Sequence, residues 1–237
     1  CARGENAAQS YTGFEPASLR AKQNSFDPYS QVEARLRQYH EMGHATDKCE
    51  LILMGGTFIA QKPATVKRFV KRCYDAFNGE TSATLEAAKK LNETSKNRVI
   101  GVTFETRPDY AKQKHIDLML SCGATRVELG VQALSDSVYK KVNRGHTLKD
   151  VITATRTCKD SALKVCYHLM PGLFSTPKED IGYFKTLFTD SRFQPDMLKI
   201  YPTLVLKGTG LYELWKNGKY EPYDTETAAE VIVDATP

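Results

Sequence analysis

The chain has 237 residues, enough for one substantial domain or two small ones. Hydrophobic residues make up 41% of it and charged residues 26%, as in ordinary globular proteins, and no apolar stretch approaches the roughly 20 residues that span a bilayer. These values exclude insertion into a membrane. The net charge of +5 permits a polyanionic partner without requiring one.

Six cysteines are spread along the chain without a C-x-x-C pair. This spacing favours neither a zinc knuckle nor a compact disulfide framework. Apart from Cys1, we expect the cysteines to be buried, reduced thiols, which indicates an intracellular, cytoplasmic location. They are Cys49, Cys73, Cys122, Cys158 and Cys166.

The amino-terminal part is predicted to be loop and helix. Residues 1–26 form a loop with one short helix at about 16–24, and Asp27-Pro28 is typical of a helix start because proline suits the first helical position. Gly43 ends this helix. Its apolar residues recur at helical spacing and are Val32, Leu36, Tyr39 and Met42.

The rest of the chain alternates between strand-like and helix-like segments. Five apolar segments of strand length are predicted at 49–54, 98–104, 126–131, 164–170 and 197–201. Helices are predicted at 63–78, 85–94, 109–121, 136–142, 148–161, 178–189, 211–217 and 226–235. This alternation predicts an α/β fold with a parallel sheet, either doubly wound or closed into a barrel. No linker or repeat divides it, so we expect one domain over residues 1–237.

Ligands of such folds bind at the carboxyl ends of the strands, so we expect the residues of a binding site there. Gly55 and Gly56 follow the first strand, where glycine lets the backbone approach a ligand, although a tight strand-to-helix turn is the more common reason for an isolated pair of glycines. Glu105 and Arg107 follow the second strand, and their alternative role is an internal salt bridge. All four residues are candidates for one shared site.

The third strand contains a carboxylate, Glu128, among apolar residues. A buried carboxylate needs a partner, which is either a cation of the core or a hydroxyl or amine of a ligand. Gln132 ends the strand with an amide that both donates and accepts. Arg144 is suited to holding a carboxylate, whereas His146 is equally typical of a helix cap or a surface residue.

The last two strands add His168, Lys199 and Tyr201. A lysine inside an apolar strand indicates that this side of the strand faces a polar interior. Polar groups therefore follow or occupy all five strands. Together they indicate a small-molecule ligand that carries an amino-acid group and hydroxyls.

The motifs GGT, VELGVQ, NRGH, HLMPG and LKIYPT occur in that order along the chain. This order resembles the radical S-adenosylmethionine (SAM) superfamily. Longer segments are QSYTGFEPASLRA, TDKCELILMGGTF, TFETRPD, ATRVELGVQ, YKKVNRGHT and DMLKIYPTLVLKGTGLYELWKNGKY. Through them the chain more narrowly resembles the catalytic subunit of Elongator and its single-chain archaeal and bacterial relatives over essentially its whole length. The resemblance implies a partial (β/α) barrel with parallel strands and a tRNA wobble-uridine acetyltransferase activity.

The resemblance also implies roles for individual residues. Gly55 and Gly56 match the motif that meets the methionyl amine of SAM. Glu128, Gln132 and Arg144 match contacts to the ribose and the methionyl carboxylate. The resemblance gives no role to His168 or Lys199.

Lys48 matches a lysine directed towards acetyl-CoA, although it is equally typical of a solvated lysine before a strand. The family also has a separate acetyltransferase domain that binds acetyl-CoA. We expect this domain to be missing beyond Pro237.

The family has a 4Fe–4S cluster that is held by three cysteines. The resemblance implies that this cluster cleaves SAM to a 5′-deoxyadenosyl radical, which activates an acetyl group for attachment to C5 of uridine. Cys1 matches the last of the three cysteines. We therefore expect the chain to start inside the cluster loop, with an incomplete set of ligands and doubtful activity on its own.

The implied partners are tRNA and acetyl-CoA, together with other Elongator subunits or a second copy of the chain. Basic residues that could contact tRNA, or simply solvate a surface, are Arg20, Lys22, Lys67, Arg68, Lys71, Arg72, Lys89, Lys90, Lys140 and Lys141. Two alternatives stay open: a radical enzyme of the coproporphyrinogen oxidase type, against which ETRPD and QSYTG argue, and a non-catalytic RNA-binding or assembly scaffold.

Overall fold

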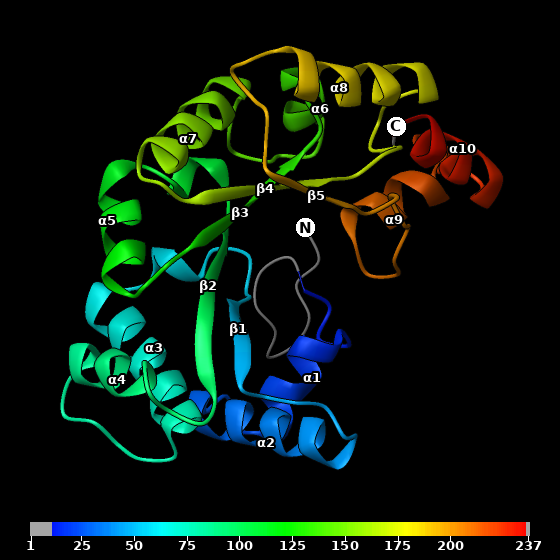
Figure 1. Ribbon diagram of the computed structural model, residues 1–237. Helices are drawn as coiled ribbons and strands as arrows, with labels where there is room; N and C mark the ends of the chain where they lie inside the picture. Colours follow the sequence, from blue (N-terminus) through cyan, green and yellow to red (C-terminus); the bar gives the residue numbers. More distant parts are fainter. Residues whose placement is uncertain (1–10, 236–237) are drawn as a thin grey trace.

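A computed structural model describes residues 11–235 of the chain. Its centre is a parallel sheet of five strands that curves into a half-barrel, with helices along the convex side (Figure 1). The strands are β1 (Lys48–Leu53), β2 (Arg98–Thr106), β3 (Arg126–Gln132), β4 (Lys164–Leu169) and β5 (Met197–Ile200). All five predicted strands are therefore confirmed, with ends that differ by one or two residues.

The order of the strands in the sheet is the order of the strands in the chain, β1 to β5. Each neighbouring pair is parallel. A doubly wound sheet would reverse its strand order at some point, and this one does not. Of the two architectures that the sequence left open, the structure therefore has the barrel type, as the resemblance implies.

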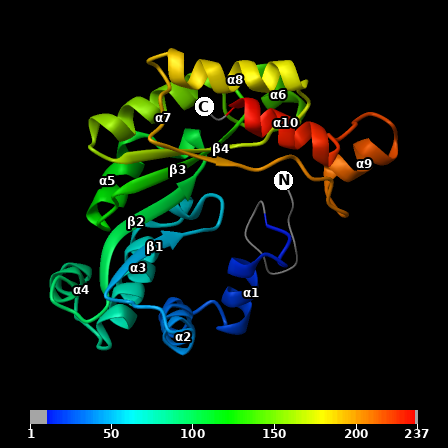
Figure 2. The same ribbon diagram turned by 45° about the vertical axis from the view of Figure 1, so that its right-hand side comes forward.

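Helices α3 to α8 connect successive strands and cover the convex face, whereas α1 and α2 precede β1 and α9 and α10 follow β5 (Figures 1 and 2). The α-helices are α1 (Pro16–Gln23), α2 (Pro28–Glu41), α3 (Pro63–Asn78), α4 (Leu85–Asn92), α5 (Gln113–Ser121), α6 (Asp136–Lys141), α7 (Leu148–Asp160), α8 (Pro177–Thr189), α9 (Gly210–Lys216) and α10 (Thr225–Ala235). Two 3-10 turns, η1 (Phe58–Ala60) and η2 (Pro108–Tyr110), complete the described elements. No described helix is long and apolar enough to cross a bilayer.

Local chemistry explains most helix boundaries. Asp27 accepts a hydrogen bond from the Ser30 N–H and so caps α2, and Thr147 and Thr176 form capping boxes at α7 and α8. Gly79 ends α3 in the left-handed conformation that glycine tolerates best.

The helix predicted at 109–121 begins later, at Gln113. The Asp109 carboxylate accepts two hydrogen bonds from Arg107 instead of capping a helix, and the chain makes the separate turn η2 before α5 starts. An acidic residue after proline was thus a misleading start signal here.

The core lies between the sheet and the convex layer of helices. Along β3, Val127 and Leu129 are fully buried on this side, where they face helix residues such as Ile116 and Val151. Four cysteines predicted to be buried thiols are indeed buried and free. Cys49 differs because it is only half-buried, on the edge strand β1, where its thiol donates to the Thr46 carbonyl.

Candidate functional site

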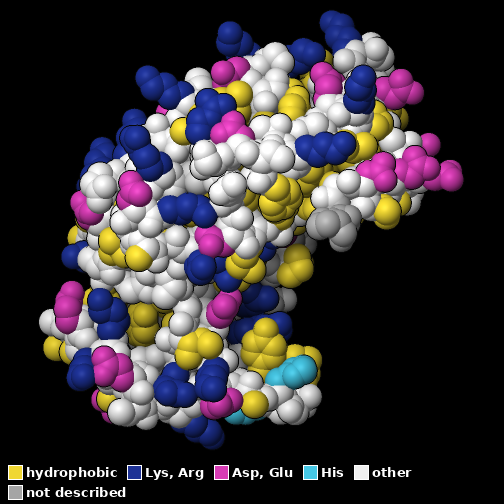
Figure 3. Space-filling view, turned by 45° about the horizontal axis from the view of Figure 1, so that its top comes forward, with side chains coloured by type: hydrophobic (Ala, Val, Ile, Leu, Met, Phe, Trp, Pro, Cys, Tyr) yellow, Lys and Arg dark blue, Asp and Glu magenta, His cyan; other side chains and the backbone are white. Residues whose placement is uncertain are grey.

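The concave face of the half-barrel is the polar face of the sheet. Side chains alternate between the two faces of a strand, so Glu128 lies opposite to the buried Val127 and Leu129. Register places Glu105 of β2 and Cys166 of β4 beside Glu128 on this face. The space-filling view shows the molecule hollowed on its open side, between the part that holds α8–α10 and the part that holds α1–α4 (Figure 3).

A chain of alternating charges crosses the concave face. A Glu50 oxygen lies 2.9 Å from an Arg126 nitrogen, and Arg126 Nε lies 3.7 Å from Glu128 Oε1. The second oxygen of Glu128, Oε2, lies 2.7 Å from Lys199 Nζ and 2.8 Å from His168 Nε2. Residues of β1, β3, β4 and β5 are thus tied together by one ionic network.

Glu128 is the buried centre of this network, with only 2% of its side chain exposed. Burial by itself raises the pKa of a carboxyl, but the hydrogen bonds from His168 and Lys199 outweigh it and lower the pKa of Glu128 to about 2. The carboxylate is therefore ionised at neutral pH. The core ion pair that the sequence offered as one explanation of Glu128 is present.

Glu128, Cys166 and His168 lie close enough to one another to be considered as metal ligands. Their chemistry argues against a metal. Burial raises the pKa of the Cys166 thiol to about 11, which keeps it protonated, and the Lys199 ammonium already occupies Glu128 Oε2. We interpret this group as part of the ionic network.

At the carboxyl end of β3, Gln132 and Arg144 meet around Gly130. Arg144 Nη2 donates a 2.9 Å hydrogen bond to the Gly130 carbonyl. A Cβ atom at Gly130 would lie 2.5 Å from this Nη2 and 3.1 Å from Gln132 Nε2. Glycine is therefore required here for the guanidinium and the amide to sit side by side.

The same edge of the sheet carries further polar groups and three residues with positive φ. Gly55 and Gly56 follow β1 with φ values of 135° and 68°, and Gln132 also has a positive φ of 72°. Glu105, at the end of β2, accepts a 2.8 Å hydrogen bond from the Tyr11 hydroxyl. A positive φ is unstrained for glycine but uncommon for a residue such as Gln132, and such residues cluster where a protein holds a ligand.

Arg107 and His146 differ from the alternatives that the sequence left open. Arg107 pairs with Asp109 at 2.6 Å and not with Glu105. His146 is buried, neither a cap nor a surface residue, and its ring packs edge-on against Tyr139 at 4.4 Å between centroids. Burial and the nearby Arg144 lower the pKa of His146 to about 4, so the imidazole is neutral at pH 7.

The structure separates the predicted site residues into three places. Gln132 and Arg144 share the carboxyl edge with the two glycines after β1, and Glu128 lies one level deeper in the hollow. Lys48 is exposed at the amino-terminal end of β1, which is the opposite edge of the sheet. Cys1 lies outside the described residues.

Sequence reasoning missed Arg126 and Glu50. Both lie on the concave face and link the edge strand β1 to Glu128. A signal for Arg126 was available, because it stands two residues before Glu128 in one strand and so shares its face. No signal in the sequence connects Glu50 to them, since strand register decides that contact.

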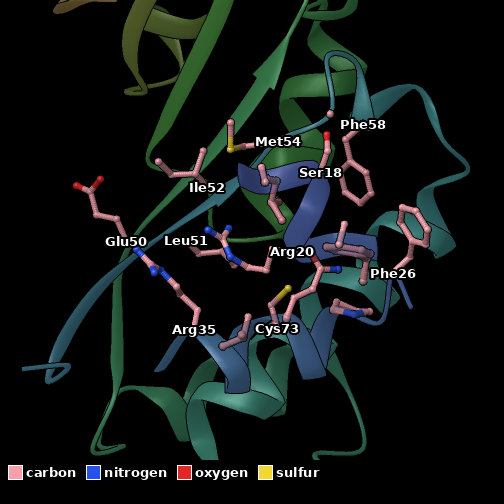
Figure 4. Close-up of a pocket in the computed structure, with 18 of the residues that line it drawn as sticks. Ser18, Arg20, Phe26, Arg35, Glu50, Leu51, Ile52, Met54, Phe58 and Cys73 are labelled. Carbon is pink, nitrogen blue, oxygen red and sulfur yellow. The ribbon is translucent and has the colours of Figure 1, made fainter. Parts of the chain in front are cut away.

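A cavity of about 570 Å³ lies beside the edge strand, between β1 and the helices α1 and α2. Its lining is mostly apolar and includes Leu51, Leu53 and Phe58. Figure 4 shows the side chains of Arg20 and Arg35 extending from α1 and α2 into it. Burial, and then the charge of Arg35, lower the pKa of Arg20.

Comparison with known proteins identifies the family. A model of the radical SAM superfamily matches residues 19–187, which is most of the chain. The chain belongs to the radical SAM superfamily. A model of the radical SAM C-terminal domain matches residues 195–237.

Named relatives of this radical SAM chain include a tRNA uridine(34) acetyltransferase and an Elongator complex protein. The chain is 53% identical over 94% of its length to the tRNA uridine(34) acetyltransferase of Methanocaldococcus infernus, and 44% identical over 96% to human Elongator complex protein 3. It spans 42% of the length of both relatives.

Solved structures support the fold. The archaeal Methanocaldococcus infernus Elp3 with an N-terminal deletion superposes with a TM-score of 0.89 at 51% identity, covering 91% of this chain and 51% of that one. Coproporphyrinogen III oxidase of Escherichia coli has a TM-score of 0.58 at 16% identity over 93% of this chain and 45% of that one. The second likeness concerns the fold alone.

We expect substitution of Glu128 to destabilise the fold much more than substitution of its exposed neighbour in the network. Glu128→Gln leaves Lys199, His168 and Arg126 around a neutral amide, and we expect it to lower the free energy of unfolding by about 2–3 kcal/mol. The matched control Glu50→Gln, whose side chain is 51% exposed, costs less than about 1 kcal/mol. Urea unfolding at pH 7 measures both. Equal losses for the two variants would contradict the central role of Glu128.

Proposed function

We propose that this chain is the SAM-binding half-barrel of an enzyme that acetylates C5 of the wobble uridine of tRNA, with acetyl-CoA as the acyl donor. The observation that carries the proposal is the pairing of Arg144 with Gln132 at the carboxyl edge of a radical SAM barrel whose relatives are named tRNA uridine(34) acetyltransferases. A coproporphyrinogen oxidase activity has weaker support, because that likeness is limited to the fold.

The residues at the carboxyl edge fit the methionyl group of SAM. Its carboxylate would accept hydrogen bonds from the Arg144 guanidinium and the Gln132 amide, which Gly130 allows to lie next to each other. Its ammonium would meet backbone carbonyls of the Gly55-Gly56 turn, where a side chain would hinder close approach.

Glu128 suits the proposed contact to the SAM ribose. Its Oε2 is bonded to Lys199 and His168, whereas its Oε1 is a buried acceptor without a hydrogen-bond partner among the described residues. A ribose hydroxyl would supply the missing donor. The network holds the carboxylate ionised and fixed in place for that contact.

We further propose that Cys1 is one ligand of a 4Fe–4S cluster. No described group of three cysteines offers an alternative site, since the described thiols are buried apart from one another or, for Cys49, lie on the edge strand. When bound and reduced, the cluster supplies the electron that cleaves SAM to the 5′-deoxyadenosyl radical. The free thiols also support the proposed cytoplasmic location.

Lys48 is proposed to contact acetyl-CoA, whose phosphates suit an exposed ammonium. Its place at the amino-terminal edge of the sheet means that this contact would be a site separate from that of SAM. Partner subunits of the Elongator type are proposed because relatives carry that name.

Exposed basic residues on α3 and α6 support weak tRNA binding. Lys67 and Arg68 are exposed on α3, and Lys140 and Lys141 on α6. Some of the other basic residues singled out in the sequence are already engaged: Lys71, Arg72 and Lys90 have acidic partners, and Lys22 and Lys89 donate to backbone carbonyls. Fewer basic side chains are thus available to tRNA phosphates than the sequence suggested. We expect the affinity for tRNA to fall as the salt concentration is raised.

The proposed activity is tested on the protein extended to include the predicted upstream cluster cysteines and the predicted acetyltransferase domain. This protein is reconstituted, reduced and incubated with SAM, acetyl-CoA and tRNA. We expect 5′-deoxyadenosine and a modified uridine at position 34, both detected by mass spectrometry. A matched tRNA with cytidine at position 34 should stay unmodified. Salt-sensitive tRNA binding without any cleavage of SAM would contradict the enzymatic proposal and favour the scaffold.

We expect Gly130→Ala to weaken SAM binding without unfolding the chain. The new methyl group would displace the Arg144 guanidinium from the Gly130 carbonyl, and we expect the dissociation constant for SAM to rise by about tenfold or more. Equilibrium dialysis with labelled SAM measures this. In the control Gly182→Ala, on α8, the methyl group meets nothing within 4 Å, so the affinity should not change. Unchanged affinity in a folded Gly130→Ala variant would overturn the assignment of Arg144.

A further inference from the structure

The last strand of the sheet places two partly exposed side chains in the hollow. Lys199 and Tyr201 are two residues apart on the extended chain, so both face the concave side. The Lys199 side chain is 36% exposed, and Tyr201 is 48% exposed. Neither residue belongs to the groups assigned above to SAM, so their exposed surfaces are available to a second ligand.

Lys199 is held in one orientation by Glu128. Its Nζ lies 2.7 Å from Glu128 Oε2, and Glu128 is fixed in turn by His168. An ammonium has three N–H donors. One is used by Glu128, and the other two have no acceptor in the described part of the chain, so they are free to donate into the hollow.

Tyr201 is held in place beside His168. Its ring lies against His168 with centroids 5.4 Å apart and an interplanar angle of 67°, and its backbone N–H donates to the Leu169 carbonyl. An aromatic ring that is held in place and half exposed offers a surface on which a flat group can stack.

The charges around this pair favour a neutral, carbonyl-bearing ligand over a phosphate. The Lys199 charge is matched by Glu128, and Glu105 on β2 adds another carboxylate in the same register row as Glu128. Both carboxylates would repel a phosphate placed here. A base that stacks on Tyr201 and presents an oxygen to Lys199 brings no charge with it.

We propose that Lys199 and Tyr201 form the subsite for the target pyrimidine, with Tyr201 as the stacking surface and Lys199 as the residue that selects uracil over cytosine. Because lysine only donates hydrogen bonds, its ammonium can donate to the carbonyl oxygen that uracil carries at C4, and it opposes the amino group that cytosine carries there. The inference rests on the proposed function, since it assumes a uridine substrate.

Photo-crosslinking tests the stacking contact. An anticodon stem-loop RNA with 5-iodouridine at the wobble position is irradiated with the protein, and the crosslinked peptide is identified by mass spectrometry. We expect the crosslink at Tyr201. Tyr201→Phe should bind the RNA as the unchanged protein does, whereas Tyr201→Leu should bind about tenfold more weakly because it loses a base-stacking contact.

Affinity for stem-loops with uridine or cytidine at the wobble position tests the selection by Lys199. We expect a preference for uridine of about tenfold, lost in Lys199→Met and kept in the control Lys164→Met, whose exposed side chain lies at the amino-terminal end of β4. The Tyr201→Leu variant should keep this ratio while losing affinity.

The outcomes separate this inference from the proposed function. If the RNA binds but crosslinks away from β5, or if Lys199→Met keeps the uridine preference, the inference is overturned and the proposed function stands. If neither stem-loop binds at low salt, the tRNA substrate itself is contradicted, and the inference fails with it.

Discussion

The buried, ionised carboxylate of Glu128 requires cations and hydrogen-bond donors around it, and its neighbours on the concave face supply them. A carboxylate that is 2% exposed must be compensated by cations and hydrogen bonds. Arg126, His168 and Lys199 provide them from the same strand and from the next two. The half-barrel therefore combines an apolar convex side, which holds the helices, with a charged concave side that must face a polar ligand or solvent.

The concave side is organised in levels along the strands. The ionic network around Glu128 lies inside the hollow, and the pair formed by Gln132 and Arg144 lies at the carboxyl edge above it. Parallel strands without reversal of order bring all these groups to one end of one surface. In the proposed function, SAM spans the two levels, with its methionyl group at the edge and its ribose at Glu128. The pyrimidine subsite on β5 would then lie beside the ribose, where a radical on its 5′ carbon would act.

Much of the fold could be predicted from the sequence, because strand-like and helix-like periods alternate along it with clear capping signals. The alternation left two architectures open, since neither residue pattern nor length reveals the order of strands in a sheet. The position of Glu128 within an apolar strand indicated that its carboxylate needs a cation or a hydrogen-bond donor as a partner. Which partner it has depends on register between β3, β4 and β5, which local sequence does not encode.

The site was harder to predict where long side chains reach across loops. Arg107 and Arg144 were both recognised as candidates, but only the structure pairs Arg107 with Asp109 and brings Arg144 to the Gly130 carbonyl. Gly130 itself gave no signal, because a single glycine in a strand has many possible causes. Its role follows from one distance, the 2.5 Å that would separate an added Cβ from the guanidinium.

The most direct test of the SAM site is a crystal structure of the protein with SAM bound. The account predicts that the methionyl carboxylate lies within hydrogen-bonding distance of the Arg144 guanidinium and the Gln132 amide, with the ribose next to Glu128. A carboxylate found instead in the cavity between β1 and the helices α1 and α2, near Arg20 and Arg35, would contradict it.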